Sequence, residues 1–139
     1  MTKTELHPVI AELLRTKFNE DDRICSNVPA YRSLFKDFIR IVSCNDAEPL
    51  TVQEIELSPG EAQVPGFRIR IYQNDLTELK PVLVYFHGGN WIAGDIQSCD
   101  AICSALAAES DYAVISVDYA LAPEYCYPIP LYQGIEVID

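Results

Sequence analysis

Positive charge is scarce in this sequence of 139 residues: ten lysines and arginines stand against 21 aspartates and glutamates, a formal net charge of −11. Because that sign repels phosphate backbones and anionic lipid headgroups, the composition argues against nucleic acid as a partner. Long apolar runs are also missing. Residues 1–8 contain no stretch suited to a signal peptide, and no segment approaches the roughly 18 apolar residues of a membrane span. We therefore expect a cytoplasmic protein without a stable membrane anchor.

Histidine is nearly absent, which limits the metal sites that the cysteines could form. The two histidines are His7 and His87, and the five cysteines are odd in number and scattered, unlike a secreted disulfide framework. Cys99 and Cys103 lie four residues apart on one predicted helix face, but a zinc site needs further Cys or His ligands. We interpret this pair as buried small hydrophobes and expect neither a metal nor a cofactor.

What the sequence does contain is a core-forming mixture, with 49% hydrophobic and 22% charged residues over the length of one ordinary domain. Apolar residues recur at three- and four-residue spacing over 6–18 and again over 29–39, which predicts two amphipathic helices. Packing of both helices on a core explains these stripes. A lid or partner-binding role is the alternative.

From residue 51 the pattern is that of strands. Apolar and polar residues alternate over 51–57 and 67–72, which predicts an antiparallel-looking strand pair. A near-continuous apolar run at 81–86 is typical of a strand covered on both faces. A helical pattern at 98–110 and a second buried strand at 112–117 follow, and this order implies a right-handed parallel crossover. The predicted fold class is therefore α/β.

The most informative stretch directly follows the strand at 81–86 and reads His87-Gly88-Gly89-Asn90-Trp91. Two glycines at the end of a buried strand let the backbone pass close to a substrate and present its N–H groups. An acyl-transfer enzyme must stabilise the oxyanion of its tetrahedral intermediate, and one fixed backbone donor contributes roughly 10²–10³ in turnover. A glycine pair alone is also common in turns, and His87 alone could be a structural histidine.

A second stretch, after the next buried strand, reads Asp118-Tyr119-Ala120-Leu121-Ala122-Pro123-Glu124. Together the two motifs resemble the hormone-sensitive-lipase-like family of α/β-hydrolases, whose members carry a His-Gly-Gly-Gly loop and an Asp-Tyr-x-Leu-Ala-Pro-Glu segment. In that family the N-terminal helices help to build a cap over the active site. The resemblance thus implies a helical cap region, residues 1–45, followed by the N-terminal half of a hydrolase core, residues 46–139.

This resemblance implies a serine carboxylesterase or lipase-like hydrolase acting on small acyl esters. The N–H groups of Gly89 and Asn90 would point at the substrate oxyanion, and Gly88 would give room for the turn. Four further residues would form a scaffold that shapes the loop without transferring protons: His87, Trp91, Asp118 and Tyr119.

The chain departs from the family pattern at Asn90, where the family has a third glycine. Asn tolerates a left-handed backbone best among non-glycine residues, so the loop conformation is retained, although its side chain could narrow the acyl pocket. Trp91 beside it is similar to the His-Gly-Gly-x-Trp loop of kynurenine-formamidase-like hydrolases, which leaves an arylformamidase-like amide hydrolase as an alternative. A non-catalytic small-molecule-binding module is another, because some relatives of this fold are receptors.

The family's catalytic triad is not found in these residues. No serine has glycines two positions away on each side, as the nucleophile elbow requires, and no histidine follows His87. We expect the nucleophile, acid and base beyond Asp139. Because loss of the serine alone costs on the order of 10⁶ in turnover, negligible esterase activity is expected from this truncated chain by itself.

A packing consequence follows from the same resemblance. In the family the third strand lies between the fourth and a fifth strand that this chain lacks, so residues 82–86 would form an edge. An apolar, uncharged edge is a template for pairing with another chain. We therefore expect self-association through this strand.

Overall fold

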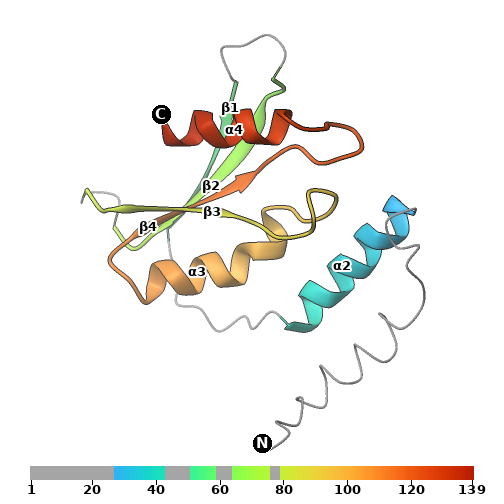
Figure 1. Ribbon diagram of the computed structural model, residues 1–139. Coiled ribbons are helices and arrows are strands. Elements are labelled where there is room, and N and C mark those ends of the chain that lie inside the picture. Colours follow the sequence, from blue (N-terminus) through green and yellow to red (C-terminus); the bar gives the residue numbers. More distant parts are fainter. Residues whose placement is uncertain (1–26, 43–50, 59–63, 76–78) are drawn as a thin grey trace, which may run out of the picture.

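The computed structural model describes residues 27–42, 51–58, 64–75 and 79–139 (Figure 1). The helix expected over residues 6–18 lies outside this part of the chain. The described elements run in the order α2 (Val28–Val42), β1 (Thr51–Leu57), β2 (Phe67–Gln73), β3 (Val82–Phe86), the 3-10 helix η2 (Gln97–Cys99), α3 (Asp100–Ala108), β4 (Ala113–Asp118) and α4 (Ile129–Ile138). None of these helices has both the length and the apolar character needed to cross a bilayer.

The strands form one mixed sheet of four strands in the order β1-β2-β4-β3. β1 pairs with β2 and β2 pairs with β4 in antiparallel fashion, whereas β3 and β4 are parallel. The alternating pattern predicts the first pair, and the strand, helix, strand order predicts the parallel pair. Both predictions are confirmed, and the chain has the expected α/β fold.

The two faces of the sheet have separate apolar clusters, because α3 and α4 lie on opposite sides (Figure 1). On the α3 side the buried residues are Tyr72, Cys99, Cys103, Ala107 and Val114. On the other side they are Phe67, Ile69, Val117 and Tyr119, with Val137 of α4 packed against them. Successive strand residues point to opposite faces, which explains why β2 contributes to both clusters. Burial of both thiols confirms the interpretation of Cys99 and Cys103.

A charge network fixes the start of α3 against the sheet. Arg70 Nη1 donates to Asp100 Oδ1 at 2.7 Å, and the same guanidinium pairs with Glu54 on β1. Tyr72 donates its hydroxyl to the same Asp100 oxygen at 2.9 Å. Asp100 is the first residue of α3, where a carboxylate also suits the positive end of the helix dipole. The network therefore fixes where the segment between β3 and α3 ends.

Among the described strands β3 is an edge of the sheet, as the family resemblance implies, and it is not covered on both faces as the apolar run predicts. Its residues Val-Leu-Val-Tyr-Phe carry no charge, and Val82 is 54% exposed. The opposite edge, β1, carries Glu54 and Glu56. Because charged side chains on an edge discourage pairing with a second chain, we propose that self-association proceeds through β3 and not through β1.

The substitution Val82→Lys is expected to weaken self-association, because it places a charge on the unprotected edge. Val52→Lys is the matched control on the opposite edge, where Val52 is 47% exposed, and it should leave association unchanged. Sedimentation velocity over a concentration series measures both variants against the wild type. A wild-type chain that stays monomeric throughout the series contradicts the proposal.

Candidate functional site

The loop that leaves β3 makes a tight turn with two left-handed residues at its centre. Asn90 has φ 56° and Trp91 has φ 58°, and the N–H of Ile92 donates to the carbonyl of Gly89 at 3.0 Å. Positive φ at both central positions is the pattern of a type I′ turn. The left-handed backbone expected at Asn90 is present. For Trp91 it is unusual, and each such residue costs roughly 1–2 kcal/mol, so the turn needs support from its surroundings.

The three glycines of this loop differ in what they require. A Cβ on Gly89, which has φ 121°, would lie 2.0 Å from the carbonyl oxygen of Ala93. A Cβ on Gly94 would lie 2.1 Å from His87 Nδ1. At Gly88 the position of a Cβ is open, with nothing within 4 Å. Gly89 and Gly94 are therefore required by the backbone. The sequence reasoning missed this role of Gly94, although an isolated glycine after the loop was a signal for it.

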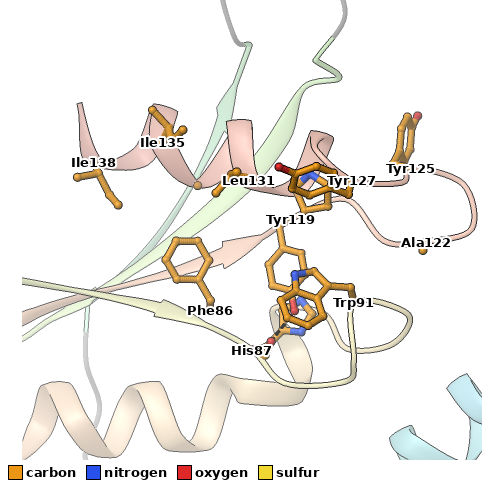
Figure 2. A pocket seen from close by; sticks show the side chains of 12 residues that line it. Phe86, His87, Trp91, Tyr119, Ala122, Tyr125, Tyr127, Leu131, Ile135 and Ile138 are labelled. Atoms are coloured by element: carbon orange, nitrogen blue, oxygen red, sulfur yellow. Dashed lines mark hydrogen bonds between the residues drawn. The ribbon is translucent and has the colours of Figure 1, made fainter.

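His87 and Tyr119, two of the proposed scaffold residues, lie in direct contact (Figure 2). Their rings stack with centroids 4.2 Å apart, and the Tyr119 hydroxyl donates to the His87 carbonyl oxygen at 2.5 Å. His87 Nδ1 lies 2.8 Å from the Gly88 carbonyl oxygen, which can only accept, so Nδ1 is the donor. His87 Nε2 is buried and finds no partner among the described residues. Burial raises the pKa of Tyr119 to about 12, so its hydroxyl remains a donor at neutral pH.

Asp118, the third proposed scaffold residue, occupies a different position. Its carboxylate accepts a hydrogen bond from Arg68 Nη2 at 2.7 Å, across the β2–β4 pair. The contact joins the end of β4 to the neighbouring strand. Asp118 therefore fixes the end of β4, where the following loop begins, to β2.

The side chain of Asn90 is turned toward α2. Its Nδ2 donates to the hydroxyl of Tyr31 at 3.0 Å. Asn90 is not among the residues that line the large pocket beside the loop. The Asn90 side chain therefore does not line this pocket, because it is hydrogen-bonded to a partner on a distant helix.

An apolar pocket of about 810 Å³ lies between the end of β3, the loop and α4. Figure 2 shows Phe86, at the end of β3, facing α4, with Trp91 and Tyr119 beside it. The remaining lining residues come mainly from α4 and the segment before it: Ala122, Tyr125, Tyr127, Pro130, Leu131, Gly134, Ile135 and Ile138, together with His87. His87 and Trp91, the residues on either side of Gly88–Asn90, thus both line a cavity suited to hydrocarbon groups.

Arg32 on α2 pairs with Glu124 in the second motif, a contact that sequence reasoning missed. Its Nη1 and Nη2 donate to the two carboxylate oxygens at 2.9 and 2.7 Å. These hydrogen bonds are the main reason why the pKa of Glu124 is lowered to about 2. The two residues are 92 positions apart in the chain, so no local pattern could have revealed the pair.

Glu124 is expected to make the stability of the protein pH-dependent. Because its pKa is about 2 in the folded chain against an ordinary value of 4.5, its contribution is complete above about pH 4.5 and is lost as the pH falls toward 2. We expect the difference in unfolding free energy between wild type and Glu124→Gln to shrink over that window in urea titrations. In an Arg32→Gln background the difference should be small at every pH. A difference that persists undiminished near pH 2 contradicts the assignment.

The two neighbouring glycines offer a matched pair of substitutions. Gly89→Ala is expected to destabilise the protein by more than about 2 kcal/mol, because its Cβ would overlap the Ala93 carbonyl and its φ is positive. Gly88→Ala should change stability by less than about 0.5 kcal/mol. Thermal unfolding monitored by far-UV circular dichroism compares the two. Equal destabilisation would show that the turn is not shaped as described.

Comparison with known proteins identifies the same region. A family model described as the alpha/beta hydrolase fold matches residues 83–139. An arylesterase of Saccharolobus solfataricus is 43% identical over 70 residues, which are 50% of this chain and 23% of that protein. The carboxylic ester hydrolase LipN of Mycobacterium tuberculosis is 33% identical over 85 residues, 58% of this chain and 23% of that protein.

A solved structure extends the similarity to nearly the whole chain. The esterase of Pyrobaculum calidifontis superimposes with a TM-score of 0.76 and 29% sequence identity, over 96% of this chain and 43% of that one. The chain thus spans less than half of this solved relative, and its matches cover about a quarter of the two curated relatives.

Proposed function

We propose that this chain, which is similar to the hormone-sensitive-lipase-like family of α/β-hydrolases, supplies the oxyanion hole and the acyl pocket of a carboxylic ester hydrolase. The observation that supports the proposal is that Gly88–Asn90 directly follow β3 between His87 and Trp91, two residues that line the apolar cavity. In the described part of the chain, no carbonyl accepts a hydrogen bond from the N–H of Gly89 or Asn90. Two donors are therefore left for a ligand.

The chemistry required of these donors is electrostatic. During acyl transfer the carbonyl oxygen of the ester becomes an oxyanion, and backbone N–H groups fixed in advance stabilise that charge without reorganising. The left-handed turn at Asn90 and Trp91 holds the backbone in one conformation, which suits this role. Asn90 keeps its N–H whatever its side chain contacts, so replacement of the family's glycine does not remove a donor.

In this proposal the attacking group comes from residues outside these 139. A serine flanked by the glycines of a nucleophile elbow is not found among them, and neither is a histidine after His87. We therefore propose that the chain alone hydrolyses esters at a negligible rate, and that a completed protein carries the activity. The arylesterase and the carboxylic ester hydrolase among its relatives support this reaction class.

The shape of the pocket supports a small acyl ester as substrate. Phe86 and Trp91 stand on the loop side, and Leu131 and Ile135 stand on α4, so an acyl chain would contact hydrocarbon on both sides. The same cavity also favours one second candidate function. Because it is formed without any triad residue, the chain could act as a non-catalytic module that binds small apolar carboxylates.

The test joins this chain, at Asp139, to the part of the Pyrobaculum calidifontis esterase that follows the matched region. We expect the completed protein to hydrolyse p-nitrophenyl butyrate. The chain alone should give the same hydrolysis rate as buffer without protein. In the completed protein Gly89→Ala should lower kcat by about 10² or more, because the donors are displaced. Tyr112→Phe, at an exposed residue directly before β4, is the control.

The second candidate is separated by titrating the 139-residue chain with butyrate while recording the fluorescence of Trp91, the single tryptophan of this chain. Saturable binding without turnover in the completed protein favours the binding module. Hydrolysis that is unaffected by Gly89→Ala contradicts the oxyanion hole.

A further inference from the structure

α2 contacts the loop after β3 at several positions along one helical face. Tyr31 accepts the hydrogen bond from Asn90, and Arg32 Nε donates to the carbonyl oxygen of Ile92 at 2.8 Å. One turn further on, Lys36 Nζ lies 3.8 Å from Asp95 Oδ2. Residues four positions apart lie on the same side of a helix, which places Arg32 and Lys36 over the same segment. The helix therefore contacts the loop at its left-handed turn and in the segment that follows it.

Arg32 also binds the second motif. Besides its pair with Glu124, its Nη2 donates to the carbonyl oxygen of Ala122 at 3.0 Å. The N–H of Ala122 in turn donates to the carbonyl oxygen of Trp91 at 2.8 Å. One guanidinium thus links α2 to both loops that border the pocket. Its planar set of donors can serve two carbonyls and a carboxylate at once, which the point charge of a lysine cannot do.

The contacts fall where the backbone conformation is least favourable. Asn90 and Trp91 are left-handed non-glycine residues, and such a conformation persists only where neighbouring structure determines it. The groups held from outside are the Asn90 side chain, the Trp91 carbonyl and the Ile92 carbonyl. Two of these three are held by α2 directly.

We propose that Arg32 is a positioning residue for the oxyanion hole, and that α2 maintains the left-handed turn through Arg32, assisted by Tyr31. The turn in place presents the N–H groups of Gly89 and Asn90, and displacement of α2 releases it. The link to catalysis rests on the proposed function. The positioning itself is tested without any substrate.

The experiment measures amide hydrogen exchange by NMR in the 139-residue chain. The N–H groups of Ile92 and Ala93 both donate to the Gly89 carbonyl, so their exchange reports opening of the turn. In Arg32→Gln we expect their exchange to accelerate at least about tenfold, since charged hydrogen bonds to two carbonyls are lost. Arg32→Lys should give an intermediate rate. Arg40→Gln, which removes the same charge from an exposed position of α2, should match the wild type.

The buried amides of Val114 and Val117 in β4 separate positioning from general stability. A positioning role accelerates exchange at Ile92 and Ala93 only, whereas loss of global stability accelerates exchange in β4 equally. The proposal is overturned if Arg32→Gln leaves the turn amides unchanged or raises exchange everywhere alike. If Arg32→Gln does not fold, Tyr31→Phe decides, with faster exchange at the turn expected and an unchanged rate overturning the proposal.

The same variant in the completed hydrolase connects the turn to catalysis. Because an oxyanion hole acts on the transition state, Arg32→Gln should lower kcat about tenfold or more while changing KM little. Faster exchange in a completed protein that hydrolyses no ester would leave the positioning role intact and remove the proposed function. Hydrolysis with unchanged exchange would do the reverse.

Discussion

The left-handed turn at Asn90 and Trp91 is the constraint on which the candidate site depends. It turns the backbone away from the direction of β3 and places Trp91 against the pocket instead of continuing a strand. Gly89 permits it by lacking a Cβ where the Ala93 carbonyl must lie. A tryptophan with φ 58° is energetically unfavourable, and this conformation occurs where the backbone itself is proposed to stabilise the oxyanion.

Three parts of the structure support the turn. From inside the core, Tyr119 holds the His87 carbonyl, and Gly94 leaves room for the His87 ring. From the neighbouring loop, Ala122 holds the Trp91 carbonyl. From α2, Arg32 holds the Ile92 carbonyl. Support of this kind matters for an oxyanion hole because donors that must reorganise during the reaction lose most of their effect.

The unpaired edge strand β3 and the apolar pocket lie next to each other. Phe86 ends the edge strand and lines the pocket, and α4 forms the opposite wall. Several apolar residues there are largely exposed, including Tyr127 at 83% and Ile138 at 70%. Contiguous apolar surface of this kind is usually covered by another segment or ligand. The pocket and the edge therefore have the same feature: apolar side chains that the described residues leave exposed.

Local patterns in the sequence determined the strands, α2, the parallel crossover and the glycine loop, because each rests on periodicity or on residues adjacent in the chain. They also predicted a left-handed Asn90 from its chemistry alone. Tertiary structure decided what local patterns cannot contain. The direction of the Asn90 side chain depends on Tyr31, 59 positions away, and the partner of Glu124 is Arg32, 92 positions away. The pairing of Asp118 with Arg68 likewise depends on strand register. Such contacts follow from how the elements pack, and packing is a property of the whole fold.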